Sequence, residues 1–259
     1  MGNSFRNIMA IAGREMRSYF VSPIGWTILG QFAIMFGYFF VVFLNSFVRQ
    51  SMEAQFGGGP QAMNINMTMI RGLFNNVSVI LLFLVPMITM RTYSEEKRSG
   101  TIELLLTSPL QDVEIIVGKF VGAMGLYCAM LGVTLVYILL LFVYGNPEWK
   151  PIVAGYAGLL LMGGCFISLG LFISSLTKDQ VLAGMGTFNV LLMLWVVNWM
   201  ADSAGPTIGA ALSYLSISGQ FDDFGKGIID TAHIVYYLSV ITFGLFLTAK
   251  SVDSERWRG

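Results

Sequence analysis

The chain has 259 residues, of which 55% are hydrophobic and only 12% are charged, and its mean hydropathy is +0.70. Soluble domains carry about a quarter charged residues, so this composition excludes a water-soluble body of this size. The 15 basic and 15 acidic side chains cancel, which excludes bulk attraction to nucleic acid.

The first predicted element is an amphipathic helix over residues 4–20. Its apolar residues recur at helical spacing, at Phe5, Ile8, Met9, Ala12, Met16, Tyr19 and Phe20. Arg6, Arg14 and Arg17 lie largely away from that face. This pattern indicates a short helix lying in the inner interface of a lipid bilayer, and a cytosolic extension of the first membrane span is the alternative.

Six segments have roughly 20 or more mostly apolar residues, the length that a helix needs to cross a hydrocarbon core of about 30 Å. In hydrocarbon the backbone must satisfy its own hydrogen bonds, so these segments are expected to be helices. We therefore predict an all-α membrane protein with one transmembrane domain over residues 1–259. The predicted spans are 24–46, 72–90, 113–143, 152–175, 181–200 and 231–249.

The distribution of basic residues predicts the orientation of the chain. With the N-terminus inside, eleven Lys and Arg residues fall on the cytoplasmic side, Lys119 among them, and four on the outer side. Cytoplasmic loops carry an excess of Lys and Arg, so both termini are predicted to lie in the cytoplasm.

Small residues mark the fourth span and the start of the third. Small residues let helix backbones approach closely in lipid, so the fourth span is predicted to lie inside the bundle. Gly118 and Gly122 form a GxxxG pair, which by itself does not indicate a dimer. The small residues of the fourth span are Gly155, Gly158, Gly163, Gly164, Ser168 and Gly170.

The inner loop over 91–112 carries the most information. Its charges end the second span in water, and Gly100 is expected to break the helix. A short amphipathic turn follows over 101–107, and Ser108-Pro109-Leu110-Gln111 is predicted to cap the third span. A short helix held between two long membrane helices can transmit a force to both of them, and its charged flanks can bind a soluble partner.

This loop resembles that of the type-2 ABC transporter permeases, in which it forms the coupling helix, here 99–108. The residues that match in order are Glu96, Gly100, Thr101, Glu103, Leu104, Leu105, Thr107, Ser108 and Pro109. The resemblance extends to the N-terminal helix, the six spans and the long loop before the last span. It implies a multi-pass protein of the bacterial cytoplasmic (inner) membrane whose loop docks on a separate ABC ATPase. The candidate contact residues are Glu95, Glu96, Arg98, Gly100, Thr101, Glu103 and Leu104, with Lys178 and Asp179 as a second contact.

The resemblance also implies the partners of the chain. Members of the family work as dimers, so a second copy or a related permease is expected. ATP and Mg²⁺ are expected in the ATPase partner, and no cofactor, metal or catalytic residue is expected in this chain. The nearest phosphate-loop candidate, 219–226, has the wrong glycine spacing and lacks the following Ser or Thr.

The outer segment over 201–230 allows three interpretations. It is a docking surface for a periplasmic or accessory protein, a re-entrant hairpin whose apolar stretch 207–215 is too short to span, or a solvated loop. The docking interpretation rests on Phe221, Asp222, Asp223 and Phe224. The stretch 221–230 also resembles the permease branch associated with gliding motility and nitrous-oxide reductase.

Three classes of function are compatible with a six-span membrane protein. A secondary transporter usually places charged residues near mid-membrane, and the central stretches of the six spans have none. A membrane enzyme needs a cluster of acid–base residues or metal ligands. His233 is the only histidine of the chain and is predicted to be an interfacial residue, which argues against an enzyme. An ATP-driven permease needs neither, and a non-transporting anchor that passes ATP-driven motion to a periplasmic machine is the alternative.

Overall fold

The computed structural model describes residues 2–56, 65–106, 110–145, 147–203 and 205–256. In these ranges every regular element is a helix and no strand occurs. Six helical segments there are long and apolar enough to cross a membrane, which confirms the predicted all-α fold with six spans. They are Pro23–Ala54, Met67–Ser99, Asp112–Tyr144, Trp149–Leu176, Gln180–Met200 and Thr231–Glu255.

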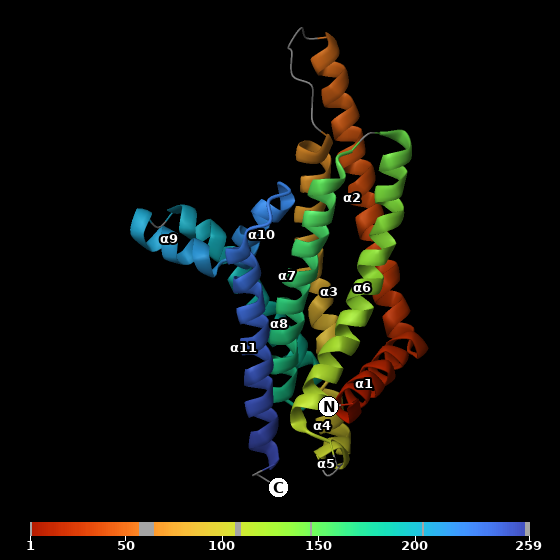
Figure 1. The fold of residues 1–259 in the computed structure, drawn as a ribbon, viewed down its shortest axis with the longest axis vertical. Coiled ribbons are helices and arrows are strands. Elements are labelled where there is room, and N and C mark those ends of the chain that lie inside the picture. Colours follow the sequence, from red (N-terminus) through yellow and green to blue (C-terminus); the bar gives the residue numbers. More distant parts are fainter. Residues whose placement is uncertain (1, 57–64, 107–109, 146, 204, 257–259) are drawn as a thin grey trace.

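The long helices run side by side, and both termini lie at the end of the bundle that also holds α4 and α5 (Figure 1). The first long helix continues to residue 56, ten residues beyond its predicted span. The elements in chain order are α1 (Gly2–Val21), α2 (Pro23–Phe56), η1 (Asn66–Ile70), α3 (Arg71–Thr89), α4 (Ser94–Ser99), α5 (Thr101–Leu106), α6 (Asp112–Tyr144), α7 (Trp149–Leu176), α8 (Gln180–Ser203), α9 (Pro206–Leu215), α10 (Ile217–Gly225) and α11 (Thr231–Arg256).

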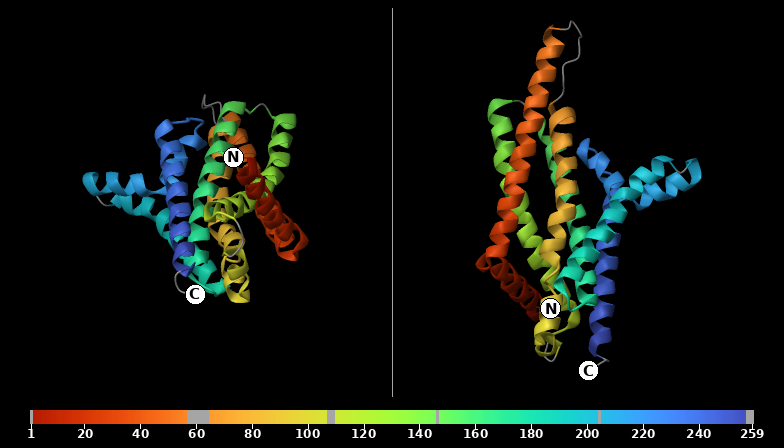
Figure 2. Two further views of the ribbon diagram at one scale, coloured as in Figure 1. Left: turned by 60° about the horizontal axis from the view of Figure 1, so that its bottom comes forward. Right: turned by 180° about the vertical axis from the view of Figure 1, so that it is seen from behind.

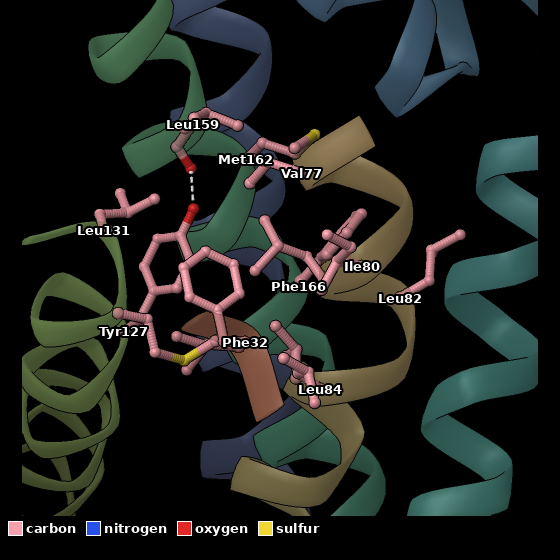
Figure 3. Packing of buried hydrophobic residues seen from close by; sticks show 14 of the residues in the cluster. Phe32, Val77, Ile80, Leu82, Leu84, Tyr127, Leu131, Leu159, Met162 and Phe166 are labelled. Atoms are coloured by element: carbon pink, nitrogen blue, oxygen red, sulfur yellow. Dashed lines mark hydrogen bonds between the residues drawn. The ribbon is translucent and has the colours of Figure 1, made fainter. Parts of the chain in front are cut away.

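Helix α7 is the centre of the bundle and contacts α3, α6, α8, α10 and α11. A Cβ at Gly155 would lie 2.2 Å from the ring of Phe74, and a Cβ at Gly163 would lie 2.2 Å from the ring of Tyr127. The Tyr127 hydroxyl donates to the carbonyl oxygen of Leu159 at 2.6 Å (Figure 3). Large side chains from neighbouring helices therefore occupy the space that the glycines leave, which confirms the predicted central place of this span.

Three other spans present most of their apolar surface outward. In the most apolar 18-residue stretch of each span, 22% of the residues are buried in α2, 17% in α8 and 22% in α11, against 72% in α7. Lipid tails are as apolar as these side chains, so such faces suit contact with a bilayer or with another membrane helix. The exposed apolar residues on α8 and α11 include Val181, Leu182, Met185, Met193, Val235, Leu238, Phe243 and Phe246.

The start of α6 differs from the prediction. Ser108 and Pro109 lie outside the described residues, and the helix is capped by Gln111 instead. The Glu114 backbone N–H donates to the Gln111 side chain, and the Gln111 N–H donates to Glu114 Oε2 at 3.3 Å. This reciprocal pair satisfies two backbone donors at the helix terminus.

Helix α1 packs along the first turns of α6. A Cβ at Gly118 would lie 2.7 Å from Ile11, and one at Gly122 would lie 2.6 Å from the Glu15 side chain. The GxxxG pair of α6 thus serves a contact within the chain. Ile11 and Ala12 are buried. Ala12 belongs to the apolar face that was predicted to lie in the bilayer interface, so part of that face packs inside the protein instead. Exposed apolar residues remain beside it, at Phe5, Met9 and Met16.

The predicted outer loop contains two helices. Helix α9 projects sideways from the bundle in both the front and the back view (Figures 1 and 2). Helix α10 turns back and packs against α7, α8 and α3. The segment therefore has regular structure, which corrects the interpretation of 201–230 as a simple solvated loop.

Candidate functional site

The candidate coupling segment forms two short helices, α4 and α5, at the end of the bundle that holds the termini. Gly100 joins them and has a φ of 73°, in the left-handed region that glycine adopts without strain. This confirms that Gly100 ends a helix. A side chain at this position would force an L-residue into a conformation that it rarely adopts, so the angle between α4 and α5 depends on glycine.

A serine of α7 fixes the turn that leads from α3 into α4. The Ser174 hydroxyl accepts hydrogen bonds from the backbone N–H groups of Tyr93 and Ser94, at 3.1 and 3.3 Å. It donates to the carbonyl oxygen of Met90 at 3.2 Å. All four residues are at least partly shielded from water, and the turn is therefore held directly by the central helix.

A buried lysine of α6 joins α4 to α1. The Lys119 side chain is 1% exposed, and its Nζ lies 2.8 Å from Glu96 Oε1 of α4 and 3.0 Å from Glu15 Oε1 of α1. The third N–H of the ammonium donates to the carbonyl oxygen of Thr92 at 2.9 Å, and the centre of the Tyr93 ring lies 5.0 Å from Lys119 Nζ. An ammonium group has three N–H donors, so every donor of Lys119 is used. Helices α1, α4 and α6 are therefore joined through the Lys119 ammonium group.

A second ion pair, made by a buried lysine and a half-buried glutamate, joins α4 to the C-terminal helix. Lys97 Nζ lies 2.7 Å from Glu255 Oε1, and the Lys97 side chain is 2% exposed. Residues 96 and 97 are neighbours in α4, so this single turn of helix is ion-paired to α1, α6 and α11. Movement of α4 therefore has to move those helices or break a buried ion pair.

The predicted contact residues fall into two groups. Glu96 points inward to Lys119, whereas Glu95, Arg98, Gly100, Thr101 and Glu103 are exposed. Glu95 also pairs with Arg91, whose Nε lies 3.3 Å from Glu95 Oε2. The side chain of Leu104 lies outside what the structure describes. The exposed group forms a polar surface at the end of the bundle, and Glu96 connects that surface to the interior.

The predicted second contact lies in the turn between α7 and α8. Lys178 and Asp179 are both exposed, and α4 touches both α7 and α8. Asp179 Oδ1 accepts from the backbone N–H groups of Val181 and Leu182, at 2.7 and 3.3 Å. Asp179 thus caps α8, a structural role that the sequence interpretation did not include.

The arginines of α1 do not form one group. Arg6 and Arg17 are exposed, as expected for an interfacial helix. Arg14 is also exposed, but its Nη2 lies 3.5 Å from Glu15 Oε1 and from Glu96 Oε1. Arg14 is therefore part of the charge cluster around Lys119.

Sequence reasoning missed the interior members of this site. Lys119 was counted as a cytoplasmic loop charge, although it lies seven residues into α6. Glu15 lies between Ala12 and Tyr19 on the side of α1 that faces α6, where a carboxylate needs a partner. A lysine inside an apolar run and a glutamate on an apolar face are the two signals that could have indicated the pair.

At the other end of the bundle, α10 contradicts part of the docking interpretation. Phe221 and Phe224 are 1% and 0% exposed, and a Cβ at Gly158 of α7 would lie 2.7 Å from Phe224. Both rings are core residues and cannot anchor an outer partner. Asp222 remains half-buried and lies 3.5 Å from Arg71 Nη2 of α3.

His233 has partners, contrary to its interpretation as an isolated interfacial residue. Its Nε2 lies 3.1 Å from Asp223 Oδ2, and its Nδ1 contacts Gln220. Asp223 Oδ1 also accepts from Lys226 Nζ at 2.7 Å. The hydrogen bond from Lys226, followed by that from His233, lowers the pKa of the Asp223 carboxyl below its ordinary value. Helices α10 and α11 are joined through this carboxylate.

We expect the variant Asp223→Asn to lower the melting temperature more at pH 7 than at pH 3. Because the pKa of Asp223 is lowered in the folded protein, its carboxylate stabilises the fold at pH values above the ordinary aspartate pKa of about 3.9. This stabilisation is lost as the pH falls through the pKa of the folded protein. The pair is partly exposed, so the contribution at pH 7 is at most about 1 kcal/mol. Melting curves of both proteins between pH 7 and pH 3 test this, and an equal deficit at both pH values would contradict it.

Comparisons with known proteins agree with this architecture. The family model for "ABC-2 family transporter protein" matches residues 9–252. Among curated proteins, the "Probable multidrug ABC transporter permease YbhR" of Escherichia coli K12 and its counterpart in Escherichia coli O157:H7 are each 27% identical over 158 residues. These matches cover 56% of this chain and 42% of each relative, so the chain spans less than half of the curated proteins that it resembles. Because the family match covers nearly the whole chain, the protein belongs to the ABC-2 family of transporter proteins.

Proposed function

We propose that this chain couples ATP hydrolysis by a separate ATPase subunit to the movement of a substrate across the bacterial cytoplasmic membrane. The observation that carries the proposal is the pairing of Glu96 with Lys119 and of Lys97 with Glu255. A force applied to α4 and α5 from outside the bundle reaches α1, α6 and α11 through these pairs. Family membership implies the ATPase partner, which would hold ATP and Mg²⁺.

The contact surface in this proposal consists of the exposed polar residues beside the Lys119 cluster. Glu95 and Glu103 are negative and Arg98 is positive, Thr101 adds a neutral hydroxyl, and Lys178 of the neighbouring turn adds a second positive charge. Complementary charge guides the encounter of two proteins and fixes their register. A soluble subunit of matching charge pattern can therefore grip α4 and α5 in one orientation.

The proposed orientation places this surface in the cytoplasm. Both termini lie at the same end as α4 and α5, and the basic residues predict that this end is cytoplasmic (Figure 1). On α1, exposed Phe5 and Met9 flank exposed Arg6 and Arg17, a composition that suits the inner membrane interface. The apolar outward faces of α2, α8 and α11 leave room for a second permease, identical or related. The closer placement with permeases associated with gliding motility and nitrous-oxide reductase stays a prediction.

The proposal is tested by co-expressing the chain with the ABC ATPase encoded beside it and isolating the complex in detergent. We expect a stable complex whose ATP hydrolysis depends on the permease. A chain that purifies without ATPase under several conditions would refute the proposal. Stimulated hydrolysis in sealed vesicles with no molecule crossing the membrane would instead indicate the force-transmitting anchor.

The variant Glu103→Arg is expected to weaken binding of the ATPase about tenfold while the membrane fold is retained, because a reversed charge on a docking surface repels its partner. Co-purification of the tagged permease with the ATPase measures the effect. The matched control is Glu53→Arg, an exposed glutamate near the far end of α2. Equal ATPase recovery from the Glu103 variant and the wild type would remove Glu103 from the contact.

A further inference from the structure

A cleft of about 860 Å³ lies between α1, the start of α2, the end of α3 and α4. It adjoins the exposed contact surface, with which it shares Glu95 and Thr101. Ligand sites for small molecules have volumes of about 300–1,000 Å³, so the cleft is large enough for a molecular group rather than a single ion.

The cleft lies where two of the candidate membrane helices begin or end. Ile24 is in the first turn of α2 and Met87 in the last turn of α3, and both side chains line it. The polar lining comes from Ser18 and Arg14 of α1, from Arg91 and from carboxylates of α1 and α4. A group that binds here would therefore have its apolar part beside the ends of two membrane helices and its polar part beside α1 and α4.

The charged lining is of both signs, and its arginines are only partly used. Arg14 pairs through Nη2 alone, at 3.5 Å, and Arg91 through Nε alone, at 3.3 Å from Glu95. The other N–H groups of both guanidinium groups have no partner in the described part of the chain. Guanidinium groups bind phosphate oxygens through paired hydrogen bonds. The Glu95 carboxylate is 53% exposed, so a cation can reach it.

We propose that this cleft binds the headgroup of a zwitterionic phospholipid that carries a primary ammonium group. The phosphate would accept hydrogen bonds from Arg14, Arg91 and the Ser18 hydroxyl, and the ammonium would donate to Glu95. A glycerol headgroup carries no positive charge, so it loses the charge-assisted contact with Glu95, which lines the cleft. A quaternary ammonium has no N–H to donate, so a choline headgroup loses the bond to Glu95.

A headgroup in this position would bridge α1 to the end of α3 and to α4, the helices that the Lys119 cluster also joins. The membrane lipid would then act as a further member of the contact between α1 and α4. This goes beyond the proposed ATP coupling and does not depend on it, because binding is measured on the permease without any ATPase.

The test is native mass spectrometry of the full chain released from detergent micelles doped with phosphatidylethanolamine, phosphatidylcholine or phosphatidylglycerol. We expect phosphatidylethanolamine to be retained about tenfold more than either other lipid, the difference that one charge-assisted contact provides. The double variant Arg14→Gln/Arg91→Gln should lose this preference. Ser18→Trp, which keeps every charge and fills the cleft, should lose it as well.

The matched control is Arg17→Gln/Arg98→Gln, which removes the same charge from α1 and α4 outside the cleft. It should keep the preference for phosphatidylethanolamine. Equal retention of the three lipids, or equal losses in the control and the cleft variant, would overturn the proposal. Displacement of the lipid by soluble glycerophosphoethanolamine at equal concentration would also overturn it, because the site would then select a soluble phosphoester rather than a membrane lipid.

Discussion

The variant Lys119→Met is expected to lower the free energy of unfolding by about 3–5 kcal/mol, because it leaves two carboxylates in a shielded site without their counter-charge. Lys119 is 1% exposed, and it is the group through which Glu15 and Glu96 are joined. Arg14, at 3.5 Å and mostly exposed, cannot replace a buried ammonium at 2.8 Å. Methionine fills a similar volume, so the loss reports the charge and not a cavity.

Unfolding of the purified chain by increasing dodecyl sulfate in mixed micelles measures the effect. Adding Glu15→Gln and Glu96→Gln to Lys119→Met should recover most of the lost stability, because no uncompensated charge then remains. Lys178→Met, an exposed lysine at the same end, should change stability by less than about 0.5 kcal/mol. If the triple variant is no more stable than Lys119→Met, the charges are not the cause and the proposed coupling through α4 loses its physical basis.

The six spans could be predicted because the bilayer fixes their length and apolar character in each local segment. The same holds for the central place of α7, since its glycines lie on a mostly apolar helix. Gly100 could be predicted as a helix end because glycine favours the left-handed conformation at helix ends. In each case the information lies within a few residues of the feature.

The charge cluster could not be predicted in the same way because its members are far apart in the chain. Lys119 is 104 positions from Glu15 and 23 from Glu96, and Lys97 is 158 positions from Glu255. Periodicity places each residue on a helix face but does not say which helix it meets. The charge count therefore treats Lys119 only as one more cytoplasmic charge, although the structure places it in the packed start of α6.

The outer segment shows the same limit of prediction from sequence, here for residues that were expected to be exposed and are buried. The docking interpretation, one of three for this segment, makes Phe221 and Phe224 exposed anchors. Once α10 forms, its helical period places both rings on the side toward α7, and Asp222 on another side toward Arg71. A nine-residue helix that directly follows the ten-residue α9 is difficult to recognise from sequence, although Ser216 caps its start.

The variant Gly163→Val is expected to destabilise the chain by about 3 kcal/mol, since it forces side-chain atoms into the ring of Tyr127. Even a Cβ would lie 2.2 Å from that ring. Tyr127 cannot move aside easily, because it is fully buried and its hydroxyl is bound to the carbonyl oxygen of Leu159 (Figure 3). We expect a lower yield of monodisperse protein and a lower melting temperature in detergent.

The matched control is Gly132→Val on α6, where no atom lies within 4 Å of the position that a Cβ would occupy. This control should melt at or slightly above the wild-type temperature, because valine has the higher helix propensity. Combining Gly163→Val with Tyr127→Leu should recover part of the loss, since the ring that causes the collision is removed. Similar melting temperatures for the two glycine variants would mean that α6 and α7 do not pack at Gly163 as closely as the structure shows, and the central role of α7 would have to be given up.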